Sequence, residues 1–305
     1  MVIGMQPMRL KLIINPSAGR QSIRQTVCDI LGYMQDDGAV SRADQHYTHG
    51  AGDAVEYAAN TSRKDYDLII AAGGDGTVNE VVNGMLRGKI DLPLAILPAG
   101  TVNDFAGSLE IPANPFEFAA MLRDFHTRKV DVGKAGDRYF LNVAAGGLLT
   151  DIAYKVPSNV KTAIGRLAYL LEGARDFPAN IYKSIPISLT AEEGQYEGDA
   201  FLFLISNSSS VGGFRKIMPS ADSCDGLLDV LVISKLDLGN LLPLFGKLLI
   251  GDHIGNEKIT YFQTRRLCVS SQLPDLRLDL DGEEDGKLPT EITCIHDALN
   301  LLVPK

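Results

Sequence analysis

Short apolar runs alternate with stretches of helical periodicity along the first third of the chain. The runs predict strands at residues 10–14, 45–48, 68–72 and 94–97, and the stretches between them predict helices at 22–34, 51–60 and 77–86. The last helix carries Val78, Val81, Val82 and Met85 on one face, as expected for a helix packed on a sheet. This alternation is typical of βαβ units around a parallel sheet, whose ligands bind at the loops that follow the strands.

The pattern changes near residue 131, where strand follows strand with turn residues between them. Strands are predicted at residues 139–143, 184–190, 200–206, 228–233, 258–262 and 276–281, with helical insertions at 161–176 and 238–249. We therefore expect a Rossmann-like, three-layer α/β domain at residues 8–130 and an antiparallel β-sandwich domain at residues 131–290. Residues 291–305 are expected to pack back on one of the two.

Composition narrows the class of ligand. The 305 residues are 45% hydrophobic, enough for two cores, and the formal net charge is −9. Nucleic-acid binding is not expected, because such proteins usually carry a basic stripe and no stretch here concentrates Lys and Arg. The four cysteines lack C-x-x-C spacing, so neither a zinc site nor a disulfide framework is indicated.

The sequence predicts a cytoplasmic protein. Its first residues lack the features of a signal peptide, and the longest apolar run, residues 236–250, is interrupted by polar residues before it could cross a bilayer. Any membrane contact is therefore expected to be peripheral. The stretches 238–249 and 163–171 are apolar enough to touch a membrane, although core packing is the more common reason for such a stretch.

The most informative motif follows the third predicted strand. Residues 72–80 read Ala-Gly-Gly-Asp-Gly-Thr-Val-Asn-Glu, and the glycines let backbone N–H groups approach a phosphate where a helix begins. Gly and Asp also build plain turns. Two further loops at the same expected sheet edge favour the phosphate site: residues 15–19, Asn-Pro-Ser-Ala-Gly, and residues 98–104, Pro-Ala-Gly-Thr-Val-Asn-Asp.

Two acids in these loops indicate a metal. A carboxylate beside a phosphate is repulsive unless a cation such as Mg²⁺ lies between them, and Asp75 and Asp104 are placed for this role. Each can instead cap the helix that follows, and for Asp104 that explanation is nearly as good. The chain has no G-x-x-x-x-G-K-[ST] segment, so a P-loop enzyme is not indicated.

Four segments together resemble the soluble diacylglycerol kinase and sphingosine kinase-like family, from about residue 9 to the C-terminus. They are Asn15-Pro-Ser-Ala-Gly19, Gly73-Gly-Asp-Gly-Thr-Val-Asn79, Gly100-Thr-Val-Asn-Asp-Phe105 and Asp281-Gly-Glu283. The resemblance implies that the first domain binds ATP, that the second helps to bind a lipid, and that Asp75 and Asp104 organise the catalytic Mg²⁺. The implied ATP contacts are Asn15, Pro16, Ser17, Ala18, Gly19, Thr48, Gly73, Gly74, Asp75, Gly76, Thr77, Val78, Asn79 and Thr101.

Asp281-Gly-Glu283 ends a predicted strand of the second domain. A lipid hydroxyl becomes a good nucleophile when a carboxylate accepts its proton. Residues 281–286 also fit an acidic, solvated turn, and the residues alone do not separate the two explanations. The resemblance favours catalysis, with Asp281 as the expected base and Glu283 in support.

Residues 222–229 match a family segment that holds a second, structural Mg²⁺. The resemblance implies the Asp222 carbonyl, the Asp225 carboxylate and the Leu227 carbonyl as ligands, an all-oxygen set that suits a hard cation. Cys224 stands where the family often has another acid. A type I turn before a strand explains the segment almost as well.

The expected function is ATP-dependent phosphorylation of a lipid hydroxyl, with diacylglycerol to phosphatidate as the leading case and a homodimer assumed on the family's example. An NAD kinase would share the glycine loop, but the chain lacks the Thr-Pro-Thr-Gly-Ser-Thr-Ala-type segment of that family. A nucleotide- or lipid-sensing protein without catalysis is the alternative from another class. The presence of Asp75, Asp104, Asp281 and Glu283 argues against it.

Overall fold

The computed structural model describes residues 6–19, 23–36, 38–147, 184–236, 243–244, 246–248, 250–274 and 276–305. These form two compact units, Met1–Val130 with Asp297–Lys305, and Asp131–His296. The predicted helical insertion at 161–176 lies outside the described residues. Within the insertion predicted at 238–249, the described residues, which begin at Pro243, are helical.

The first unit alternates strands and helices as the sequence predicts. Its elements are β1 (Met8–Ile14), α1 (Ile23–Gln35), β2 (Val40–Tyr47), α2 (Asp53–Ala59), β3 (Leu68–Gly73), α3 (Asp75–Arg87), β4 (Leu94–Pro98), α4 (Asp104–Ser108) and α5 (Pro115–Asp124). The chain passes between the units within β5 (Thr127–Ala135) and β15 (Thr290–Leu302).

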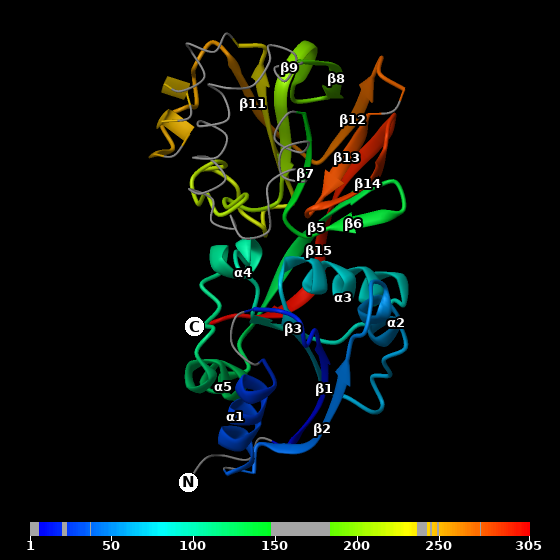
Figure 1. Ribbon diagram of the computed structural model, residues 1–305, viewed down its shortest axis with the longest axis vertical. Coiled ribbons are helices and arrows are strands. Elements are labelled where there is room, and N and C mark those ends of the chain that lie inside the picture. Colours follow the sequence, from blue (N-terminus) through cyan, green and yellow to red (C-terminus); the bar gives the residue numbers. More distant parts are fainter. Residues whose placement is uncertain are drawn as a thin grey trace. The chain divides into compact units, whose positions relative to one another are not determined.

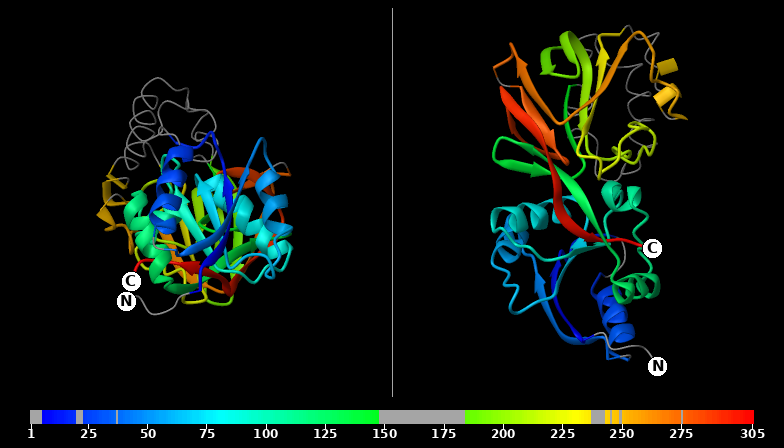
Figure 2. Two further views of the ribbon diagram at one scale, coloured as in Figure 1. Left: turned by 90° about the horizontal axis from the view of Figure 1, so that it is seen from below. Right: turned by 180° about the vertical axis from the view of Figure 1, so that it is seen from behind.

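The four strands β1–β4 lie in the order β2-β1-β3-β4, and all their pairings are parallel. The helices α1 and α5 contact each other on one face of this sheet, and α2 and α3 contact each other on the opposite face (Figure 1; Figure 2). The three-layer α/β fold is therefore confirmed. Because β2 and β3 flank β1 on opposite sides, the chain order reverses at β1, which is where open α/β sheets bind ligands.

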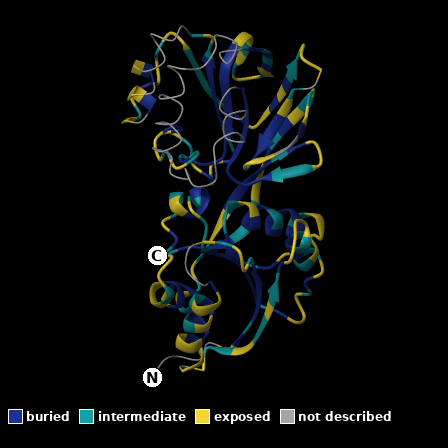
Figure 3. Cartoon of the chain, viewed as in Figure 1, coloured by how far each residue is buried: buried dark blue, intermediate teal, exposed yellow. Residues whose placement is uncertain are grey.

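The helix α3 shows why this sequence folds as it does. The predicted stripe of Val78, Val81, Val82 and Met85 is buried, at 5% exposure or less. Each such side chain removed from water contributes about 1.5–3 kcal/mol of hydrophobic stabilisation. Figure 3 shows the same division in the other helices, with one face buried and the other exposed.

The second unit is built from antiparallel strands, as predicted. Besides the shared strands it contains β6 (Arg138–Phe140), β7 (Val143–Gly147), β8 (Ile185–Ala191), β9 (Gln195–Ser206), β10 (Leu228–Ser234), β11 (Ile259–Thr264), β12 (Arg266–Ser271), β13 (Arg277–Leu280) and β14 (Glu283–Lys287). The central strand β9 pairs with β7, β8 and β10. Its side chains enter two apolar clusters: Phe203 and Ile205 join one, and Phe201 and Leu204 join the other.

Two sequence predictions for this unit differ from the structure. The strand predicted at 139–143 is interrupted, because β6 ends at Phe140 and β7 begins at Val143. The break coincides with backbone N–H groups that bind a side-chain carboxylate instead of a neighbouring strand. The tail expected to cover one domain is strand β15, which pairs with β12 in the second unit and places Leu301 beside Leu94 of β4 in the first.

Candidate active site

Three loops of the first unit meet at the carboxyl edge of the parallel sheet. Asn15 follows β1, and its side-chain Nδ2 donates a hydrogen bond of 3.1 Å to Oγ1 of Thr77 in α3. The Asn15 backbone N–H donates to the carbonyl of Ala72 in β3, and its Oδ1 accepts the N–H of Ser17 at 2.9 Å. The amide of Asn15 therefore fixes the loop after β1 against the start of α3.

The loops after β3 and β4 approach each other through glycines. A Cβ added to Gly100 would lie 2.6 Å from the Cα of Gly74, closer than real Cβ atoms come to other atoms. At Gly73 an added Cβ would meet the Thr77 side chain at 2.5 Å. The two glycine loops are thus packed backbone against backbone, and the N-cap residue of α3, Gly74, makes no side-chain hydrogen bond to the N–H groups at the start of the helix. Such a helix start favours a bound anion.

A hydrogen bond connects one candidate metal-binding acid to the loop that carries the other. Oδ2 of Asp75 accepts the backbone N–H of Asn103 at 2.9 Å, and Asp104 is the next residue in the chain. Asn103 has a positive φ of 52°, and its side chain closes a small ring with Gly100, accepting the N–H at 3.2 Å and donating to the carbonyl at 3.0 Å. Asp104 is buried at 9% exposure. Asp75 is therefore hydrogen-bonded to the residue that directly precedes Asp104.

The remaining predicted ATP contacts occupy different positions around this edge. Thr48 follows β2, is 9% exposed, and donates its backbone N–H to the carbonyl of Ile14. Gly76 and Thr101 are exposed, whereas Val78 is buried on the sheet side of α3. Asn79 is also buried, and its Oδ1 accepts a hydrogen bond from Nδ2 of Asn83 one turn later. Asn79 thus has a packing role within α3.

In the second unit, Asp281 lies directly after β13 and beside the start of β7. Its Oδ1 accepts the backbone N–H groups of Asn142 and Val143 at 2.9 and 2.8 Å, and its Oδ2 accepts that of Leu141 at 2.6 Å. Asp281 has a positive φ of 53°. Glu283 begins β14 and is exposed.

The 222–227 loop is compact and acidic. The carbonyl of Asp222 accepts the N–H of Asp225 at 3.3 Å, and Oδ1 of Asp225 accepts the N–H of Leu227 at 2.9 Å. Burial, followed by the charges of Asp222 and Asp131, raises the pKa of Asp225 above its usual value. Burial and the negative charges of Asp131 and Asp225 raise the pKa of Cys294 to about 12. A cation here would relieve this repulsion, so the donor set fits a hard divalent ion.

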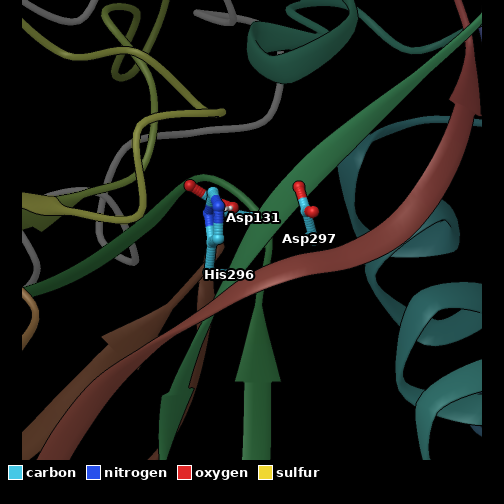
Figure 4. A group of neighbouring side chains, drawn as sticks. All are labelled: Asp131, His296 and Asp297. Atoms are coloured by element: carbon cyan, nitrogen blue, oxygen red, sulfur yellow. Dashed lines mark hydrogen bonds and ion pairs between the residues drawn. The ribbon is translucent and has the colours of Figure 1, made fainter.

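Asp131 contacts the 222–227 loop, although the sequence indicated this residue only as the start of the second domain. It is fully buried, and its Oδ2 accepts the N–H of Gly226 in the acidic loop at 2.6 Å. Its Oδ1 lies 2.8 Å from Nδ1 of His296, with the two side chains facing each other in Figure 4. His296 received no role from the sequence, because 165 positions separate it from Asp131 and no local spacing reveals such a pair.

Comparisons with known proteins identify the family. Residues 9–135 match the model of the diacylglycerol kinase catalytic domain, and residues 145–303 match that of the YegS C-terminal NAD kinase beta sandwich-like domain. A protein named diacylglycerol kinase from Bacillus subtilis (strain 168) is 35% identical over 298 residues, covering 97% of each chain. One from Staphylococcus haemolyticus is also 35% identical, covering 97% of this chain and 88% of its own.

Solved structures agree with this assignment. A crystal structure described as a diacylglycerol kinase from Bacillus anthracis matches with a TM-score of 0.80 at 27% identity and covers 99% of both chains. The chain therefore belongs to the diacylglycerol kinase family, and it is a phosphotransferase that uses an alcohol group as acceptor. Among the residues that the structure describes, no helix combines the length and the apolar character needed to span a bilayer.

Proposed function

We propose that this enzyme transfers the γ-phosphate of ATP to the free hydroxyl of diacylglycerol and produces phosphatidate. The observation that carries the proposal is the convergence of the loops after β1, β3 and β4, held together by Asn15, by the Gly74–Gly100 approach and by the Asp75–Asn103 hydrogen bond. Backbone N–H groups at the start of a helix are suited to triphosphate oxygens. The names of the relatives support the lipid acceptor.

In this proposal the nucleotide lies along the sheet edge of the first unit, at residues 15–19, Thr48, residues 73–79 and Thr101. Mg²⁺, held by Asp75 and Asp104, would neutralise charge on the phosphates. The Asn103 N–H fixes one oxygen of Asp75 and so orients the other. The chain supplies positioning and charge, which are what phosphoryl transfer requires of a protein.

The segment Asp281-Gly-Glu283 provides the carboxylate that receives the proton of the acceptor hydroxyl. As this proton leaves, the hydroxyl oxygen forms its bond to the γ-phosphorus and the bond from phosphorus to ADP breaks. A base within hydrogen-bond reach contributes about 10²–10⁴-fold to such a step. We assign residues 131–290 to acceptor binding and residues 8–130 to the nucleotide on this basis.

We further propose a structural Mg²⁺ at the 222–227 loop, with the Asp222 carbonyl, the Asp225 carboxylate and the Leu227 carbonyl as ligands. Burial, together with the nearby charges of Asp131 and Asp222, raises the pKa of Asp225, and this unrelieved negative charge supports the site. We also propose that the enzyme is cytoplasmic. Because diacylglycerol resides in membranes, the enzyme would contact the membrane surface peripherally. A homodimer is assumed on the family's example.

The test is incubation with Mg²⁺ and γ-labelled ATP in the presence of diacylglycerol, sphingosine, ceramide, phosphatidylglycerol or NAD, followed by identification of the labelled product. Label in phosphatidate is expected. Label in another lipid would replace the acceptor and keep the mechanism, and label in NADP would show that the acceptor assignment is wrong. Absence of label from every product would contradict the proposed function.

A further inference from the structure

Asn142 lies at the break between β6 and β7, and hydrogen bonds hold it through most of its polar groups. Its backbone N–H donates to Oδ1 of Asp281 at 2.9 Å. Its backbone carbonyl accepts the N–H of Asn207 at 2.8 Å and the hydroxyl of Ser206 at 3.1 Å. Its side-chain Oδ1 accepts the hydroxyl of Ser208. The surrounding chain therefore fixes both the position and the orientation of the Asn142 amide.

The remaining polar group of this residue, the Nδ2 amide nitrogen, makes no hydrogen bond within the described part of the chain. Asn142 is only 8% exposed, and a donor withdrawn from water without a partner is costly, so folded proteins rarely leave one unused. The neighbouring Asn207, by comparison, donates its Nδ2 to the carbonyls of Asp131 and Leu141 at 2.8 and 3.0 Å. Asn142 thus offers a donor that suits a ligand.

This donor lies beside the segment proposed to receive the proton of the acceptor hydroxyl. One hydrogen bond separates Asn142 from the Asp281 carboxylate, and the next residue, Val143, begins β7 and joins an apolar cluster with Phe201 and Leu204. A carboxylate, an amide donor and an apolar surface therefore follow one another. In diacylglycerol, a hydroxyl, an ester on the neighbouring carbon and an acyl chain follow one another in the same order.

Resting on the proposed function, we infer that Asn142 is a specificity-determining residue for the acceptor lipid. Its Nδ2 donates a hydrogen bond to the ester carbonyl next to the reacting hydroxyl. An amide N–H is only a donor, so it suits a carbonyl oxygen and disfavours an ammonium group such as the one beside the primary hydroxyl of sphingosine. A site built around such a hydrogen bond discriminates against analogues that leave its donor unpaired.

The experiment compares two acceptors of equal chain length, a diacylglycerol and its dialkyl ether analogue, which keeps the free hydroxyl and lacks both ester carbonyls. The ratio of their kcat/KM values is measured for the wild type and for Asn142→Ala. The wild type should prefer the diester by about tenfold or more, because the ether leaves Nδ2 unpaired. Asn142→Ala should abolish this preference, lowering kcat/KM for the diester about tenfold more than for the ether.

Asn142→Asp provides a second route if Asn142→Ala fails to fold, because it keeps the shape of the side chain and the oxygen that accepts the Ser208 hydroxyl. It replaces the Nδ2 donor by a second oxygen, which would face the ester carbonyl. The preference for the diester over the ether should disappear in this variant too. The ratio of kcat/KM for sphingosine to that for diacylglycerol should rise above the wild-type ratio, because a carboxylate attracts an ammonium group.

Asn83→Ala is the matched control, because it removes the amide of a residue that is 2% exposed and lies on α3 in the first unit. It should change kcat/KM for the diester and the ether by the same factor. Equal use of the two acceptors by the wild type, or the wild-type preference retained in both Asn142 variants, would overturn the inference. Absence of transfer to either acceptor by the wild type would overturn the proposed function and the inference with it.

Discussion

Gly100 illustrates how a single residue shapes the nucleotide edge. Its missing side chain allows the loop after β4 to touch Gly74 in the loop after β3, and the same space is bordered by Oδ1 of Asn103 at 2.8 Å from a hypothetical Cβ. Because the backbone N–H of Asn103 also donates to Asp75, the packing of Gly100 is linked to the orientation of the acid proposed to hold Mg²⁺.

We expect Gly100→Ala to force these loops apart. ATP binding should weaken at least tenfold, and the rate of phosphoryl transfer should fall further, because a displacement of about 1 Å at a reacting group can cost 10²-fold. Nucleotide affinity measured by titration calorimetry and steady-state kinetics check this. The matched control is Gly107→Ala in α4, where an added Cβ meets nothing within 4 Å. Equal effects of the two substitutions would contradict the packing explanation.

At this scale the sequence indicated the loops whose residues lie close together in the chain. Asn15, the Gly73–Gly76 loop and Asn103 follow predicted strands, so the chemistry of each loop was readable from the printed sequence. Asn207 and the Asp131–His296 pair were not readable. Their contacts join positions 65 or more apart, and Asn207 stands in a serine-rich stretch that resembles an ordinary turn.

Among elements, the acidic loop before β10 is where a metal should affect stability. Without a cation, burial and the charges of Asp222 and Asp131 oppose ionisation of Asp225, so its pKa is raised. Mg²⁺ should therefore raise the Tm of the wild type, and a chelator should reverse the increase. Asp225→Asn should remove the Mg²⁺ dependence, whereas the control Asp252→Asn, at an exposed acid, should retain it. A Tm that is unaffected by Mg²⁺ would contradict the structural site.

His253 gives a pH prediction for the segment that follows Ile250. The ring is fully buried, and its Nε2 donates to the carbonyl of Ile217 at 2.9 Å. Burial lowers the pKa of His253 below its usual value. The folded chain therefore binds this proton less readily than the unfolded chain, whose histidines have a pKa of about 6.5. Its contribution to stability is complete above that pH and is lost as the pH falls toward the lowered folded value.

We expect the free energy of unfolding to decrease by up to about 1.4 kcal/mol per pH unit in that window on account of His253. Urea unfolding at a series of pH values measures the slope. His253→Gln should reduce the slope even if it also lowers stability at neutral pH. An unchanged slope in His253→Gln would show that another group controls the acid response.

Secondary structure was predictable where periodicity was strong. The buried stripe of α3 and the apolar runs of β1, β3 and β4 follow directly from the pattern of residues. β12 was missed because Arg266, Cys268 and Ser270 alternate with the apolar positions in a run too short to stand out. The break at Leu141 was not predictable, since it depends on Asp281, a residue 140 positions away.

For the whole molecule, several motifs together indicate the fold class and the family, whereas no single motif is specific enough to do so. The parallel sheet places three loops at one edge, and the antiparallel unit places Asp281 and Glu283 after a strand end. The identity of the acceptor is a property of the lipid-binding surface as a whole. Apolar pockets of similar shape arise from many sequences, so the pattern of residues does not select one lipid.

The most direct measurement of the central claim is the rate at which label from γ-labelled ATP enters phosphatidate with diacylglycerol and Mg²⁺ present. The wild type should form labelled phosphatidate, and Asp75→Asn should lower kcat about 100-fold or more because the carboxylate charge for Mg²⁺ is lost. Asp91→Asn, at an exposed acid paired with Arg63, should match the wild type. If the wild type transfers no label to phosphatidate, or if Asp75→Asn keeps full activity, the account is contradicted.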